Sequence, residues 1–146
     1  MLGPDVEQPL GPLSPVGKVS LAAEILAAYA SVRLALWRTD LPRTIEAARS
    51  LSGSHGGRKA DTRKEQLLGA RLGRAVVRTL RLLPTDSRCL MRSLVLTKLL
   101  ARRGVDSALV IGVSLEPEFA AHAWVEREEV PLLPTDRSQY ARLVRF

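Results

Sequence analysis

One segment constrains the fold of this chain more than any other: residues 88–103 are apolar on nearly every side of a helix. The apolar positions recur at helical spacing and are Leu90, Met91, Leu94, Val95, Leu96, Leu99 and Leu100. A helix with so little polar surface is usually buried, so we expect it at the centre of the domain. Asp86 or Ser87 can cap its start, and Gly104 can supply a left-handed stop.

Strand-like runs follow this helix. Residues 107–113 read as a buried strand, and residues 121–126 as a second one. In the second run His122, Trp124 and Glu126 alternate with apolar residues, so the three side chains share one face. Residues 140–146 are expected to add another strand. The pattern predicts an α+β fold in which the central helix packs on a small antiparallel sheet.

The residues before the central helix are expected to be helical. Residues 1–17 contain four prolines and three glycines, which predicts a disordered tail. Helices are predicted at about 20–37, from Pro42 to about 51, and from the capping box at 62–65 to about 83. The expected organisation is therefore a tail at 1–17, a helical region and loop at 18–60, and a core at 61–146.

The net charge of +7 is unevenly distributed. Residues 51–84 carry eight Lys or Arg against two Asp or Glu, and the arginines at helical spacing are Arg71, Arg74, Arg78 and Arg81. This ridge could bind an acidic peptide or partner, or it could simply face water. Aromatic residues are 4% of the chain and are not interleaved with the ridge, which argues against nucleic acid.

Other classes of protein are disfavoured by composition. A single cysteine excludes an internal disulfide and any zinc site with several thiolates, so we expect no metal and no cofactor. The cysteine usage fits a reducing compartment, and we expect a cytoplasmic protein. The most apolar stretch, residues 21–37, is interrupted by Glu24 and Arg33 and is short for a membrane span. We therefore expect no membrane span.

Cys89 and His122 are the candidate catalytic residues. Cys89 falls in the first turn of the central helix, where the helix dipole favours an anionic sulfur. A thiol at a helix start and an imidazole on a following strand are typical of a cysteine-nucleophile enzyme. A buried structural cysteine and a satisfied core histidine would give the same pattern, but the two together favour catalysis, with Trp124 beside the histidine.

A carboxylate that orients the imidazole would complete a triad. A hairpin centred on residue 129 sets residue 136 opposite residue 122, so the register nominates Asp136. Glu126 shares the face of His122 but points in parallel from the same strand. A register shift of one residue would turn Asp136 to the other face.

These motifs resemble the transglutaminase-like core of the lasso-peptide leader peptidases. The resemblance covers about residues 68–146 and rests on four runs in order: Ser-Arg-Cys-Leu-Met-Arg-Ser-Leu at 87–94, Arg-Gly-Val at 103–105, Leu-Val-Ile-Gly-Val at 109–113 and His-Ala-Trp-Val-Glu at 122–126. It implies a papain-like triad with Cys89 as nucleophile, His122 as general base and acid, and Asp136 as orienting residue. One departure is Arg-Glu-Glu at 127–129, where family members often turn with glycine.

The resemblance also implies a substrate and partners. The substrate would be a ribosomally made precursor peptide, whose leader is removed before an asparagine-synthetase-like cyclase closes the ring. Because this chain resembles the split form of the family, it would act with a separate leader-recognition protein. Arg71, Arg74, Arg78, Arg81 and Trp124 are the candidate partner- or substrate-binding residues. A transglutaminase-like acyl transferase and a non-catalytic basic adaptor that holds precursor or cyclase remain as alternatives.

Overall fold

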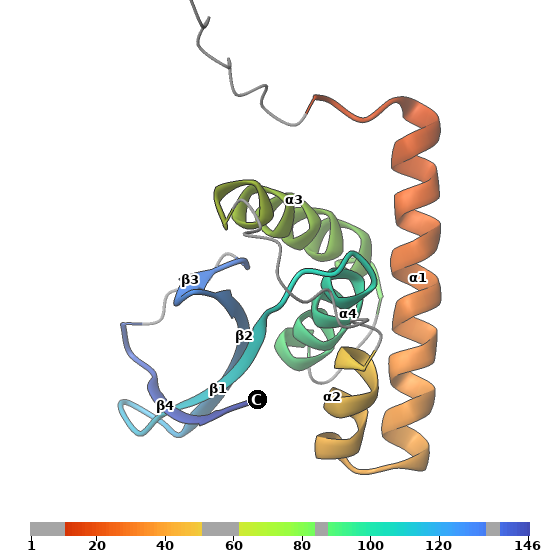
Figure 1. The fold of residues 1–146 in the computed structure, drawn as a ribbon. Coiled ribbons are helices and arrows are strands. Elements are labelled where there is room, and N and C mark those ends of the chain that lie inside the picture. The colour runs from red at the N-terminus through yellow and green to blue at the C-terminus, as the bar shows by residue number, and fades with distance from the viewer. Residues whose placement is uncertain (1–10, 51–61, 84–87, 134–137) are drawn as a thin grey trace, which may run out of the picture.

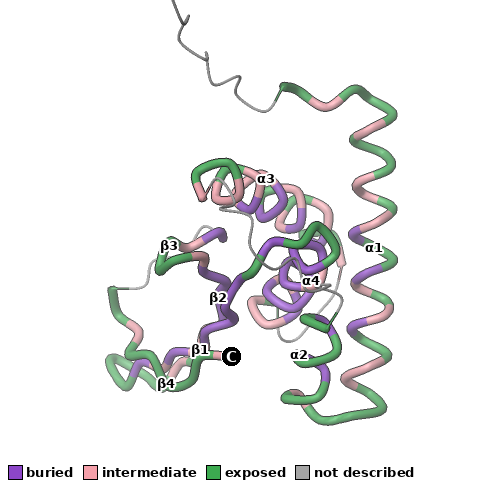
Figure 2. Tube along the Cα trace, in the orientation of Figure 1, coloured by how far each residue is buried: buried purple, intermediate pink, exposed green. Residues whose placement is uncertain are grey.

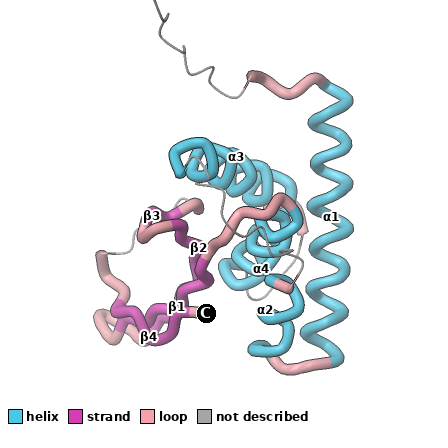
Figure 3. The backbone as a smooth tube through the Cα atoms, viewed as in Figure 1, coloured by secondary structure: helices cyan, strands magenta, loops and turns pink. Residues whose placement is uncertain are grey.

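The computed structural model describes residues 11–50, 62–83, 88–133 and 138–146. Within these residues, four helices precede four strands: α1 (Pro15–Arg38), α2 (Leu41–Arg49), α3 (Thr62–Leu80), α4 (Arg88–Arg102), β1 (Ala108–Ser114), β2 (Ala120–Arg127), β3 (Val130–Pro131) and β4 (Ala141–Arg145). The helices form one layer and the strands another (Figure 1, Figure 3). The predicted α+β class is confirmed, and the segment that holds His122 is a strand.

Helix α4 lies at the centre of the fold. Leu94, Val95, Leu96, Leu99 and Leu100 are completely buried (Figure 2). The other three helices pack on α4 from the helical side, and β2 packs on it from the sheet. Gly104 has a φ of 70° and ends the helix, and the Val105 N–H donates to the Leu100 carbonyl at 3.0 Å. The predictions of a buried central helix and a glycine stop are confirmed.

The four strands form an antiparallel sheet in the order β3-β2-β1-β4. Leu109 of β1 pairs with Val125 of β2, and both belong to the same buried cluster as the core residues of α4. These two side chains therefore define the face of the sheet that packs on the helices. Because side chains alternate along a strand, His122, Trp124 and Glu126 lie on the opposite face.

The hairpin between β2 and β3 differs from the predicted one. Arg127 pairs with Val130, so the turn consists of Glu128 and Glu129 alone, with φ of 47° and 66°. Two positive φ values are typical of the tight hairpin turn that usually selects Asn or Gly. The pairing is centred between residues 128 and 129 rather than on 129. The predicted hairpin centre at residue 129 is therefore wrong, and the geometric argument for Asp136 loses its premise. Asp136 itself lies outside the described residues, so its role stays a prediction.

Helix α1 begins earlier than predicted. It starts at Pro15 rather than near residue 20, because Ser14 caps it by accepting the Gly17 N–H at 3.1 Å and Pro15 suits the first turn. The predicted disordered tail therefore does not extend to residue 17. By length and composition this 24-residue helix could cross a membrane, a test that core helices and signal sequences also pass. The absence of a membrane span stays a prediction.

Two glycines of α3 allow this helix to lie close to the segment that follows β3. A Cβ on Gly73 would lie 2.2 Å from the backbone oxygen of Leu132, and one on Gly69 would lie 2.7 Å from a methyl carbon of the Leu132 side chain. Leu132 and Leu133 are buried there. The two glycines thus let α3 fix the backbone at Leu132, four residues before Asp136.

We predict that Gly73→Ala lowers the free energy of unfolding by about 1–3 kcal/mol, because backbone atoms cannot yield as a side chain can. Gly69→Ala is the matched control and should cost less, since only flexible side-chain atoms obstruct its methyl group. Alanine is otherwise favoured over glycine in a helix by about 1 kcal/mol. Urea denaturation would measure both variants. A Gly73→Ala protein as stable as the wild type would contradict the close approach.

Candidate functional site

Cys89 is the second residue of α4 and is half-buried. The first turn of the helix contains no acidic residue. The buried part of α4 begins two residues later, at Met91, so Cys89 lies where the central helix comes to the surface. The predicted caps Asp86 and Ser87 lie outside the described residues. The positive end of the helix, exposed in this way, is a suitable setting for a sulfur nucleophile.

The connectivity directs Cys89 and His122 toward one end of the domain. Helix α4 is joined to β1 by the short turn at Gly104 and packs on β2. Its 15 residues span ~22 Å and the seven residues of β1 span ~23 Å, so α4 should begin near the end of the sheet where β1 stops and β2 starts. His122 is the third residue of β2, paired with Gly112.

The imidazole of His122 lies in an aromatic setting. Its ring centroid is 6.0 Å from that of Trp124, with an interplanar angle of 23°, and 5.2 Å from that of Tyr140, at 28°. This burial lowers the pKa of His122 below its usual value, because it disfavours the charged imidazolium. At neutral pH the ring is therefore the neutral form, which can accept a proton.

A polar network lies beside His122 and includes Glu126 and Arg142, two residues that were not predicted to belong to the site. Glu126 is completely buried, and its Oε1 accepts from the Trp124 indole at 2.7 Å and from the Arg142 guanidinium at 3.0 Å. Gly112 makes room for the indole, since a Cβ there would lie 2.7 Å from the ring. The network fixes the indole that stacks on His122. Glu126 itself was the sequence feature that could have indicated this network. An acid in so apolar a strand is expected to be buried, and a buried carboxylate needs a cationic partner.

A pocket of about 450 Å³ opens on this face of the sheet, lined by Trp124, Ser138, Tyr140 and Arg142. Trp124 was predicted as a binding residue, and the structure sets it between the histidine and this pocket. The lining offers aromatic surface and one guanidinium. It could accept an extended peptide segment by stacking and by charge-assisted hydrogen bonds.

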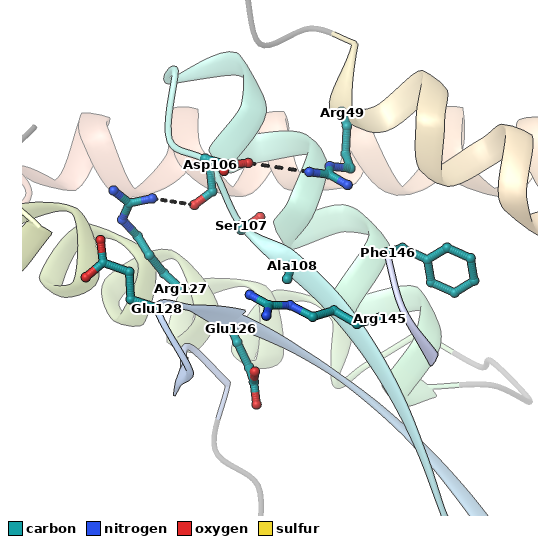
Figure 4. Close-up of a pocket in the computed structure, with 9 residues that line it drawn as sticks. All are labelled: Arg49, Asp106, Ser107, Ala108, Glu126, Arg127, Glu128, Arg145 and Phe146. Carbon is teal, nitrogen blue, oxygen red and sulfur yellow. Dashed lines mark hydrogen bonds and ion pairs between the residues drawn. The ribbon is translucent and has the colours of Figure 1, made fainter. Parts of the chain in front are cut away.

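A second, polar pocket of about 550 Å³ lies where α2, the α4–β1 turn, β2 and β4 meet (Figure 4). Arg49 approaches the Asp106 carboxylate at 3.5 Å, and Arg127 donates to the Asp106 carbonyl at 2.7 Å. In Figure 4 the Glu126 side chain points away from these contacts. Neither Cys89 nor His122 lines this pocket, and two of its arginines hold the α4–β1 turn. We therefore regard it as structural.

The predicted site residues are only partly brought together. His122 and Trp124 are in contact, and Cys89 belongs to the helix that packs on the other face of the sheet. The described ring contacts of His122 are with other sheet-layer residues, so its pairing with Cys89 stays a prediction, as does the role of Asp136. Arg71, Arg74 and Arg78 share a groove with α1, whereas Arg81 lies past the end of α3.

The comparison with protein families agrees with this architecture. The model of the Transglutaminase-like superfamily matches residues 26–145, and the chain belongs to that superfamily. Members are usually catalytic and act through a cysteine as proteases or acyl transferases. No curated protein and no solved structure matches the chain.

We predict a lowered pKa for His122 in solution. In a His55→Gln background His122 is the only histidine, and its NMR titration should give a pKa below the usual ~6.5. The neutral ring should contribute fully to stability above about pH 6.5, the pKa of histidine in the unfolded chain. This contribution should be lost as the pH falls through the lower pKa of the folded protein. Tyr140→Ser should raise the pKa by exposing one ring face. An ordinary pKa in both proteins would contradict the burial.

Proposed function

We propose that the chain is a cysteine endopeptidase that removes the leader from a lasso-peptide precursor in the cytoplasm. The observation that carries the proposal is the thiol of Cys89 at the start of the buried helix in a transglutaminase-like domain. The resemblance of residues 68–146 to the leader peptidases supplies the substrate class. A separate leader-recognition protein would present the precursor, and a cyclase would act on the product.

In the proposed reaction the Cys89 sulfur attacks the carbonyl carbon of the scissile peptide bond, and His122 takes the thiol proton. The tetrahedral intermediate collapses to a thioester, while His122 gives the proton to the departing amine. Water, deprotonated by His122, then hydrolyses the thioester and releases the leader as a carboxylic acid. The lowered pKa of His122 supports the first step, because the imidazole is neutral and ready to accept a proton.

We predict that Cys89→Ala lowers cleavage of precursor at least about a thousandfold, because the nucleophile is lost. Purified protein, precursor and leader-recognition protein would be incubated and followed by mass spectrometry. Circular dichroism would verify that the variant is folded. A Cys89→Ala protein that still supports the pathway at the wild-type level would instead favour the non-catalytic adaptor.

Asp136→Ala should reduce the rate by less than Cys89→Ala does, by about one to two powers of ten, because an orienting residue contributes less than the nucleophile. Asp106→Ala is the matched control, since in the described part of the chain this exposed carboxylate pairs with Arg49 at the surface. Equal rates for the two aspartate variants would remove Asp136 from the triad.

The acyl-transferase alternative has the same chemistry up to the thioester. It differs in the acceptor, which would be an amine instead of water. Adding a small primary amine to the precursor reaction separates the two. The peptidase reading predicts a free carboxylate on the leader, whereas a transferase would give the amide, which differs in mass.

A further inference from the structure

The groove between α1 and α3 lies outside the proposed catalytic chemistry. It has a volume of about 340 Å³, and its floor is apolar, formed by Leu21, Ala22, Ile25 and Ala75. A second hollow of about 270 Å³ shares Leu13, Leu21 and Arg71 with it, so the depression continues along the two helices. Helices α1 and α3 pack on each other beneath it.

The charges along this groove have one sign. Lys18, Arg71, Arg74 and Arg78 line it, and none of the described residues in its lining is acidic. Across the described part of the chain, no carboxylate pairs with any of the three arginines. Glu24, in the adjoining hollow, is already bound by Arg103 at 2.8 Å, and that hydrogen bond holds the pKa of Glu24 below its usual range. Among the residues that the structure describes, the cations of the groove therefore have no paired counter-ion.

The spacing of these cations defines what can bind. Arg71 and Arg78 are seven residues apart on α3, a distance of ~10 Å along the helix, with Arg74 between them on the same side. Two turns of a helical ligand cover that length, and so do about three residues of an extended one. A ligand must also cover the apolar floor, which a purely polar polyanion does not do.

We propose that this groove is a docking site for a short acidic, amphipathic segment of a separate polypeptide. Its apolar side chains would cover Leu21 and Ala22, and its carboxylates would pair with Arg71, Arg74 and Arg78. Charge complementarity identifies the occupant: a groove with uncompensated guanidinium groups over an apolar floor favours Leu and Glu in alternation. This docking requires neither Cys89 nor His122, so it can be tested apart from the peptidase chemistry.

The protein used in the test is the full chain with Cys89→Ala. The probe is a fluorescein-labelled peptide in which leucine and glutamate are arranged so that one side is apolar and the other acidic. Fluorescence polarisation should show saturable binding that weakens as salt rises from 0.1 to 1 M, where the Debye length falls from ~10 to ~3 Å. Arg74→Glu with Arg78→Glu should raise the dissociation constant about tenfold or more. Arg38→Glu with Arg43→Glu makes the same charge change away from the groove and should leave it nearly unchanged.

Two further probes decide the occupant. A peptide with serine in place of leucine keeps the charge but loses the apolar side chains, and it should bind several-fold more weakly. A single-stranded oligonucleotide of equal charge should bind more weakly still. Equal effects of the two double variants, or tighter binding of the serine peptide or the oligonucleotide, would overturn the proposal. If the groove binds the peptide as expected but the wild-type chain does not cleave precursor in a separate assay, only the proposed function fails.

Discussion

The burial of α4 is the constraint on which the rest of the structure depends. Five of its apolar residues have no exposed surface, so the helix must be covered on every side. Three helices and β2 provide that cover. One of its buried hydroxyl groups is satisfied within the helix, because the Thr97 hydroxyl donates to the Ser93 carbonyl at 2.9 Å. A helix held this firmly is a rigid support, and it reaches the surface at its first turn, where Cys89 stands.

The parts of the fold that the sequence predicts are those fixed by local pattern. The all-round apolar helix, the stop at Gly104 and the alternation in β2 each follow from residues within one segment, and the structure confirms them. The register of the β2–β3 hairpin, by contrast, could not be predicted from the local pattern of residue types. It depends on Glu128 and Glu129 adopting positive φ values that glutamate rarely takes, so the residue types gave no signal for so tight a turn. The register argument for Asp136 assumed a turn centred on residue 129, and the pairing of Arg127 with Val130 removes that support.

The network around His122 shows a second limit of sequence reasoning. Glu126 and Arg142 are 16 residues apart, and they meet because β4 pairs with β1 across a register shift at Ile111 and Gly112. Such an irregularity changes which side chains share a face, and it leaves little trace in a five-residue strand. Tyr140 reaches the imidazole through the same arrangement. His122 could be nominated from the sequence as a candidate base, but its surroundings could be known only from the topology of the sheet.

These surroundings bear on the form in which the proposed enzyme would work. Two stacked rings desolvate His122 and lower its pKa, so the imidazolium is disfavoured in the resting protein. A stable pair of thiolate and imidazolium needs the charged ring, which this desolvation disfavours. The proposed chemistry therefore favours proton transfer to His122 as the sulfur attacks, rather than before substrate binds. The positive end of α4 would then act mainly on the charge that develops during attack, which is where a fixed dipole lowers a barrier.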